Sequence, residues 1–182
     1  MRWFEPVMKI LALDDLPAQP WKNGGGVTRE IARREDEEGL VWRLSLADVD
    51  RDGPFSIFTG AERVLTVVEG AGLRLRCANA VIEALPGVPV AFSGETPIDS
   101  ELVSGPVRDL NLIYDPRRAH ASVTRLGAGR HQTRALGILP LGAALLIAGV
   151  GVVAPGSFAF AEGQEIEIEV PPDGAALVVA IA

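Results

Sequence analysis

Hydrophobic residues recur along the chain in short runs, separated by Gly, Pro, Asp and Asn at intervals of about ten residues. The clearest alternation lies between Gln164 and Val170, where Ile166, Ile168 and Val170 share one face and three glutamates share the other. No window sustains a helical period for long. The pattern therefore predicts an all-β chain folded as sandwiches or barrels.

The individual runs predict strands in both halves of the chain. In the first half these strands are expected over 27–33, 41–49, 63–69, 72–77, 88–92 and 108–114. In the second half they are expected over 143–148, 151–154, 156–160, 165–170 and 175–182. A short helix over 115–122 is expected to join the halves.

The two halves repeat one another at a spacing of 69 residues, which separates Pro86-Gly87 from Pro155-Gly156. A repeat of this length indicates two copies of one small β domain. We therefore expect a first module over 1–115, a connection over 116–122 and a second module over 123–182. The N-terminal strands are expected to join the sheet of the second module. The polar positions Asp109 and Asn111 of the first copy correspond to Val178 and Ala180 in the second, so functional chemistry is predicted in the first module.

Composition limits the class of protein and the cellular compartment that the sequence predicts. With 182 residues, 48% hydrophobic and 23% charged, the chain is expected to be globular. No apolar run reaches the ~20 residues of a membrane span, and MRWFEPVMK lacks the apolar segment of a signal peptide. Translation from Met8 instead of Met1 is an open alternative, because the strand pattern begins at Lys9. The lone Cys77 rules out an internal disulfide, which favours a cytoplasmic location.

Charge argues against nucleic acid as a partner. The net charge is −7, and phosphate binding needs a clustered basic face. Adjacent basic pairs occur only at Arg33-Arg34 and Arg117-Arg118, and the first pair is followed at once by four acidic residues. We expect neither a nucleic-acid nor a membrane partner.

Several polar side chains fall on inward-facing positions of predicted strands. Alternation places Arg43 with Ser45 on one face of their strand and Asp109 with Asn111 on one face of theirs, while Arg63 opens a third strand. A buried arginine needs an anionic partner, and Arg binds a carboxylate through two parallel hydrogen bonds. These residues predict a pocket for a carboxylate ligand. The alternative is a structural Arg43–Asp109 ion pair.

The most unusual local sequence is PWKNGGGVTRE, which begins at Pro20. Its three glycines allow close backbone approach, but the pattern is neither a P-loop nor a dinucleotide-binding loop. Its polar and aromatic residues are predicted to form a lid or a pocket wall: Trp21, Lys22, Asn23, Thr28 and Arg29. The alternative is a glycine turn that enters an edge strand.

The sequence gives little support to a metal site or to a catalytic nucleophile. Transition-metal sites generally use several imidazoles or thiolates at close spacing. The only histidines, His120 and His131, lie outside the first module, so no histidine of that module could activate Cys77. We predict no metal, no cofactor and no dedicated catalytic residue.

These motifs resemble those of the HutD/Ves family over about residues 8–115. The resemblance is carried by Trp21–Gly26, Thr28–Ile31, Trp42–Ser45, Gly53–Ser56 with Phe58, Gly60 and Arg63, Phe92–Glu95 with Pro97, Gly105-Pro106, and Asp109, Asn111 and Leu112. The resemblance implies a bicupin of two packed jelly-roll-like modules. It also implies an association with bacterial histidine utilisation, in which the protein binds a pathway intermediate and restrains the pathway. The ligand would then be of the formylglutamate, formiminoglutamate or urocanate class.

The resulting hypothesis is a metal-free binding protein for a small anionic metabolite. Arg43 and Arg63 would hold the carboxylate, while Ser45, Asp109 and Asn111 would orient the ligand. Two alternatives stay open. One is a metal-independent hydrolase or isomerase with Asp109 or Glu30 as acid or base. The other is an interaction module, including a homodimer, that joins through the face of Trp42, Leu44 and Leu46.

Overall fold

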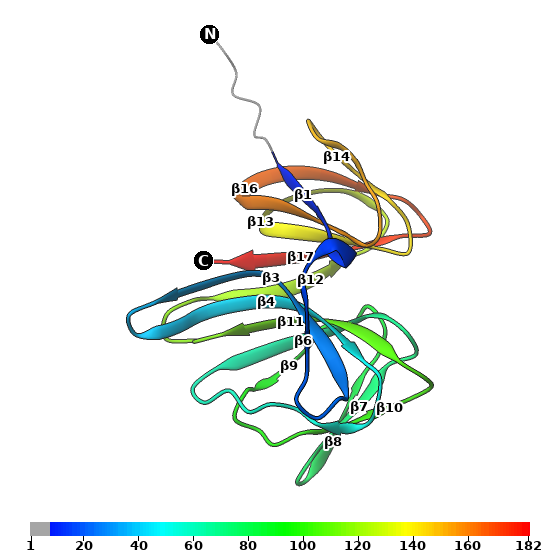
Figure 1. The fold of residues 1–182 in the computed structure, drawn as a ribbon. Helices are drawn as coiled ribbons and strands as arrows, with labels where there is room; N and C mark the ends of the chain where they lie inside the picture. The colour runs from blue at the N-terminus through cyan, green and yellow to red at the C-terminus, as the bar shows by residue number, and fades with distance from the viewer. Residues whose placement is uncertain (1–7) are drawn as a thin grey trace. The chain divides into compact units, whose positions relative to one another are not determined.

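The computed structural model describes residues 8–182, which form two compact units (Figure 1). The first unit comprises residues 16–121, and the second combines residues 8–15 with 122–182. Both consist of β-strands, as the alternation predicted. The question of whether translation starts at Met1 or Met8 concerns residues 1–7, which lie outside the described range.

The first unit contains a six-stranded and a four-stranded sheet. The larger sheet has the order β2-β3-β4-β11-β6-β9 and comprises β2 (Ala18–Pro20), β3 (Gly26–Asp36), β4 (Gly39–Val49), β11 (Val107–Tyr114), β6 (Glu62–Glu69) and β9 (Val90–Ser93). The smaller has the order β5-β10-β7-β8 and comprises β5 (Gly53–Pro54), β10 (Asp99–Leu102), β7 (Leu73–Cys77) and β8 (Ala80–Ala84). A shared apolar cluster that includes Leu65, Val67, Leu73 and Leu75 joins the two sheets.

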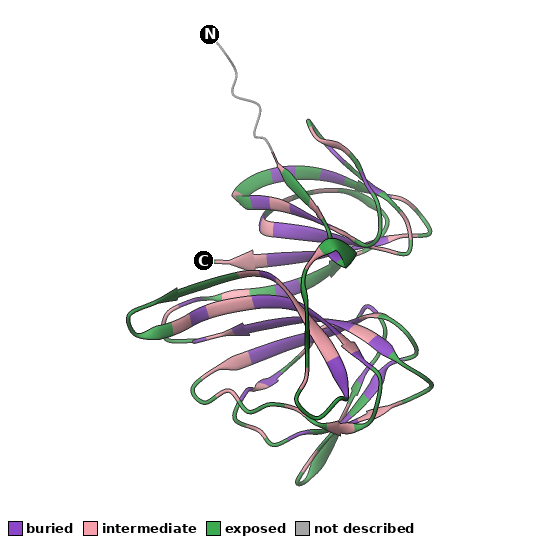
Figure 2. Cartoon of the chain, in the orientation of Figure 1, coloured by how far each residue is buried: buried purple, intermediate pink, exposed green. Residues whose placement is uncertain are grey.

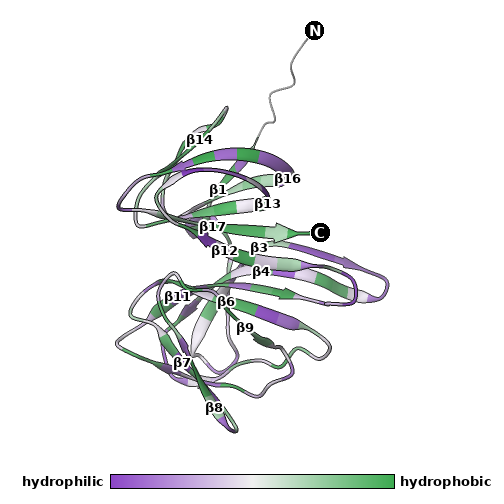
Figure 3. Cartoon of the chain, turned by 180° about the vertical axis from the view of Figure 1, so that it is seen from behind, coloured by the Kyte–Doolittle hydropathy of each residue, from purple (hydrophilic) through white to green (hydrophobic). Residues whose placement is uncertain are grey.

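The second unit is built on one seven-stranded sheet of order β12-β17-β13-β16-β14-β15, with β1 paired to β16. Its strands are β12 (Ala121–Leu126), β17 (Ala175–Ile181), β13 (Gly129–Leu141), β16 (Ser157–Val170), β14 (Leu145–Ile147), β15 (Gly151–Val153) and β1 (Lys9–Ala12). A 3-10 helix, η1 (Leu13–Asp15), follows β1. β17 is apolar in Figure 3 and mostly buried in Figure 2, and its Ala176 and Val178 belong to this unit's apolar core.

The repeat seen in the sequence corresponds to a repeated pairing path. In the first unit β4, β11, β6 and β9 are neighbours in that order, and in the second β12, β17, β13 and β16 are. The β7–β8 hairpin likewise corresponds to the β14–β15 hairpin. Asp109 and its counterpart Val178 therefore lie on equivalent strands, β11 and β17.

The N-terminal strand pairs with the second unit's sheet, as predicted, since β1 runs antiparallel to β16 with Lys9 opposite Phe160. Residues 8–15 consequently group with the second unit, whereas the expected first module extended over 1–115. The first unit ends at residue 121.

The prediction of a helix over 115–122 is wrong. Asp115 is followed by a turn over residues 116–118, and β12 begins at Ala121. The Asp115 carboxylate accepts hydrogen bonds from the backbone N and the guanidinium of Arg117, which lower the pKa of Asp115 to about 2. The Asp115 side chain thus holds the turn, and the chain enters β12 at Ala121 instead of continuing as a helix.

Candidate functional site

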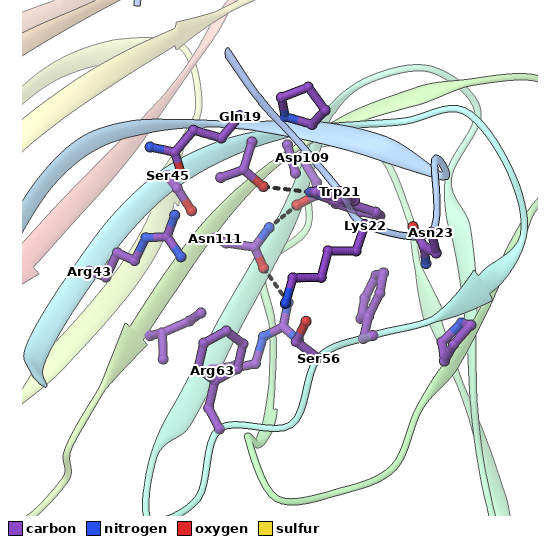
Figure 4. Close-up of a pocket in the computed structure, with 17 residues that line it drawn as sticks. Gln19, Trp21, Lys22, Asn23, Arg43, Ser45, Ser56, Arg63, Asp109 and Asn111 are labelled. Carbon is purple, nitrogen blue, oxygen red and sulfur yellow. Dashed lines mark hydrogen bonds between the residues drawn. The ribbon is translucent and has the colours of Figure 1, made fainter. Parts of the chain in front are cut away.

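A cavity of about 620 Å³ lies within the first unit. Its floor comes from β3, β4, β11 and β6 of the larger sheet, and its walls come from the β2–β3 turn and from the segment between β5 and β6 (Figure 4). The lining residues are Gln19, Pro20, Trp21, Lys22, Asn23, Thr28, Arg43, Ser45, Ala47, Pro54, Phe55, Ser56, Phe58, Arg63, Asp109, Asn111 and Ile113. Nine of the ten predicted site residues are among them.

Strand register brings the polar side chains together. On β4 and β11, Ser45 stands opposite Asn111 and Ala47 opposite Asp109. On the other side of β11, Arg63 of β6 stands opposite Ile113. Because side chains alternate between the faces of a strand, residues at every second position of these neighbouring strands face the same cavity.

Arg63 is buried, with only 6% of its surface exposed, and it forms no ion pair within residues 8–182. One guanidinium NH₂ donates to Asn111 Oδ1 at 2.7 Å, while Nε has no hydrogen-bond partner. The guanidinium carbon lies 4.9, 5.6 and 5.2 Å from the ring centres of Phe55, Phe58 and Phe92. Desolvation lowers the pKa of Arg63 to about 10, against the attraction of Asp109. Arg63 remains a cation at neutral pH, held by aromatic faces.

Asp109 is fully buried beside this arginine. Its Oδ1 accepts a hydrogen bond from Asn111 Nδ2, and its Oδ2 has no partner. Desolvation raises the pKa of Asp109 to about 7, although Arg63 and the Asn111 hydrogen bond both act to lower it. Figure 4 shows Asp109, Asn111 and Arg63 in a row, linked through the Asn111 amide.

The predicted alternative of an Arg43–Asp109 ion pair is wrong. Arg43 Nε donates to Glu30 Oε2 at 3.0 Å, across the β3–β4 pairing. Arg43 points into the cavity from the side opposite Lys22 (Figure 4). The acid that neutralises Arg43 therefore lies on β3. Asp109 interacts instead with Asn111, through a hydrogen bond, and with the charge of Arg63.

The glycine-rich segment forms a turn that also lines the cavity, and the strand that follows it, β3, pairs with both β2 and β4 and is therefore not an edge strand. Asn23 Oδ1 accepts from the backbone N of Gly25, and Trp21 Nε1 donates to Thr28 Oγ1 at 2.8 Å. Position 26 requires glycine, because a Cβ there would lie 2.2 Å from the Asp48 carbonyl oxygen. These contacts hold Trp21 and its neighbours at the cavity's edge.

Arg29 is the predicted site residue that does not line the cavity. Thr28 faces the cavity, so its neighbour Arg29 lies on the opposite face of β3 and forms an ion pair with Asp48. Adjacent residues of a strand point to opposite faces, so Thr28 and Arg29 cannot both line the cavity.

The interpretation based on sequence missed the aromatic residues around Arg63. Phe55 and Phe58 belong to an irregular segment, so strand alternation gives them no direction. The signal available was the presence of the two phenylalanines themselves, because a buried guanidinium without an ion pair packs favourably against aromatic faces.

No histidine or cysteine is among the lining residues. Across residues 8–182 no three His, Cys, Asp or Glu side chains gather in a way that could hold a metal ion. His131 contacts the Gly127 carbonyl oxygen in the second unit. In the same range no helix is long and apolar enough to cross a membrane.

Comparison with known proteins gives relatives for this chain. A model of the HutD family matches residues 13–153. An uncharacterized 21.2 kDa protein from the region 3′ of hutC in Pseudomonas putida is 43% identical over 122 residues, which are 63% of this chain and 62% of that protein. Protein Ves of Citrobacter koseri is 34% identical over 123 residues, covering 64% and 62%. The chain thus spans less than two thirds of the length of these curated relatives.

Solved structures extend the likeness to nearly the whole chain. HutD from Pseudomonas fluorescens SBW25, determined in a formate condition, has a TM-score of 0.81 and 32% identity and covers 97% of this chain and 100% of its own. A cupin 2 conserved barrel domain protein from Leptotrichia buccalis has a TM-score of 0.61 at 9% identity over 96% of each chain. The second likeness shows the fold alone, which is cupin-like.

Proposed function

The chain belongs to the HutD family, and we propose that it binds a small carboxylate-bearing metabolite in the cavity of the first unit and thereby modulates histidine utilisation. The observation that carries this proposal is Arg63. A buried guanidinium without an ion pair, facing a cavity, is a binding group for a planar anion.

The charges around the cavity support an anionic ligand. Three lining side chains are basic, Lys22, Arg43 and Arg63, and one is acidic, Asp109. Glu30 neutralises Arg43 through its ion pair, whereas Lys22 and Arg63 have no ion pair within the described chain. A cavity of about 620 Å³ falls within the usual range for small-molecule sites.

The pathway part of the proposal rests on relatives. The family's name and the Pseudomonas putida relative from the region 3′ of hutC favour histidine utilisation. The ligand classes that fit a small carboxylate in this pathway are formylglutamate, formiminoglutamate and urocanate. The lone cysteine favours a cytoplasmic site of action.

A thermal-shift panel of these three compounds tests the proposal. A ligand at ~100 times its dissociation constant adds about 2.7 kcal/mol, which for a chain of this size raises the melting temperature by roughly 5–10 °C. Arg63→Ala should abolish the rise. Arg74→Ala is the matched control, because Arg74 lies exposed on β7 with Glu83 as its partner.

Two outcomes would decide against the proposal. The first is that no compound raises the melting temperature of the wild-type protein. The second is that an Arg63→Ala variant, shown by circular dichroism to be folded, keeps the full rise.

A metal-independent enzyme is the second candidate function, and Asp109 favours it. A buried carboxyl group with a pKa of about 7 in a cavity wall has the properties of a general acid or base. Mass spectrometry of the panel samples separates the two candidates. Consumption of a compound by the wild type but not by Asp109→Asn would favour catalysis, and recovery of the intact compound favours binding alone.

The interaction-module alternative has less support. Leu44 and Leu46, on the face proposed to join subunits, are fully buried within the chain itself. They are therefore unavailable to a partner in this fold.

A further inference from the structure

Asp109 and an anionic ligand would compete for the same cation. The carboxylate of Asp109 has one oxygen bound by Asn111 and one without a partner, and its principal positive neighbour is Arg63. Arg63 is also the group to which the proposed function assigns the ligand carboxylate. Two negative charges would then share one desolvated guanidinium.

The other charged groups around Asp109 do not remove this conflict. From β4, Asp48 adds a second negative charge that acts on Asp109, and Arg43 is already paired with Glu30 of β3. Lys22 lies at the turn between β2 and β3 and is exposed. The wall from Pro54 to Phe58 contributes no titratable side chain to the lining.

On the basis of the proposed function, we propose that binding of a carboxylate ligand beside Arg63 is coupled to the uptake of one proton by Asp109. The proton comes from solvent and converts the carboxylate of Asp109 to a neutral carboxyl group. One negative charge then remains beside Arg63, and the oxygen of Asp109 that lacks a partner gains an O–H that can donate to the ligand.

The direction of the effect follows from linkage. Burial already places the pKa of free Asp109 at about 7, and a nearby anion raises the pKa further. Above about pH 7 the free protein must therefore take up a proton to bind, and affinity falls by up to about tenfold for each pH unit. Below about pH 6 Asp109 is already protonated, and affinity is independent of this group.

Titration calorimetry with N-formyl-L-glutamate at about pH 8 tests the coupling. The binding enthalpy is measured in phosphate and in Tris, whose ionisation heats differ, and the difference gives the number of protons exchanged. We expect an uptake approaching one proton for the wild type and none for Asp109→Asn, which keeps the shape of the side chain without its titration. Asp99→Asn, at an exposed position on β10, should keep the uptake.

The possible results separate this inference from the proposed function. Binding by the wild type with the same enthalpy in both buffers overturns the coupling and leaves the binding function standing. Uptake that persists in Asp109→Asn overturns the assignment to Asp109. If the wild type binds none of N-formyl-L-glutamate, formiminoglutamate and urocanate at millimolar concentration, both proposals are overturned. If Asp109→Asn fails to fold, the comparison of buffers with the wild type still decides whether a proton is taken up.

Discussion

At the scale of single residues, the first unit keeps an arrangement that is unfavourable for folding. Arg63 and Asp109 are both desolvated, and neither satisfies the other directly, because Asn111 stands between them. Burying a charge without a matched partner costs free energy. The equivalent strand of the second unit has apolar Val178 and Ala180 instead. The polar trio is therefore expected to serve the cavity and not the core.

The Asp109→Asn variant should change how stability depends on pH. Because the pKa of Asp109 is raised from 3.8 to about 7, the folded protein binds more protons than the unfolded chain between these values. The free energy of unfolding of the wild type therefore falls as pH rises through this window. Relative to the wild type, Asp109→Asn should gain roughly 2–4 kcal/mol between about pH 4 and pH 8.

Urea unfolding at a series of pH values measures this gain. Asp99→Asn serves as the control and should track the wild type. Parallel stability profiles for the wild type and Asp109→Asn would mean that Asp109 titrates normally in the folded chain.

Much of the cavity could be predicted from residue alternation alone. Arg43, Ser45, Asp109 and Asn111 alternate with large apolar residues, and this pattern fixes which face each occupies. The partners could not be predicted, because pairing depends on register: Glu30 reaches Arg43 only because β3 aligns it with Ser45 of β4. The aromatic residues of the irregular 54–58 segment follow no period, so their place around Arg63 required the fold.

At the scale of elements, the β2–β3 turn sets the cavity's edge. The position of this turn depends on the close approach of β3 to β4 at Gly26, where any side chain would clash with the Asp48 backbone. Gly24 adds a positive φ of 67° that residues with side chains seldom adopt.

Gly26→Ala should therefore both destabilise the chain and displace the cavity wall. Overpacking of this kind costs about 1–3 kcal/mol, and the added methyl group meets backbone instead of a flexible side chain. Chemical denaturation measures the loss, and the thermal-shift response to a ligand should fall with it. Gly53→Ala is the matched control, because its Cβ would meet nothing within 4 Å, and we expect a change within about 0.5 kcal/mol. Equal stability of both variants would contradict the close-approach argument.

The elements that the sequence misrepresented share one cause. The thirteen-residue β13 contains Gly137 and Pro140, which suggest a break, yet pairing with both β16 and β17 holds it extended. The predicted strands 156–160 and 165–170 are one strand, β16, that continues through Glu162 and Gly163 at positive φ. Partner strands, which local patterns do not reveal, decide both cases.

At the scale of the whole molecule, the two units share one order of strand pairing but differ in what their sheets enclose. In the first unit the path surrounds a cavity with polar walls. In the second its core is a cluster of apolar residues that includes Ile138, Ile168 and Val178. We therefore expect each chain to bind one ligand, in the first unit.

The most direct test is a crystal structure of the protein with whichever compound of the panel gives the largest thermal shift. We expect one ligand in each chain, with its carboxylate within hydrogen-bond distance of the Arg63 guanidinium and its body between the Trp21 turn and the 54–58 segment. A ligand bound in the second unit, or one in the first unit whose carboxylate does not contact Arg63, would show that Arg63 is not the carboxylate-binding group.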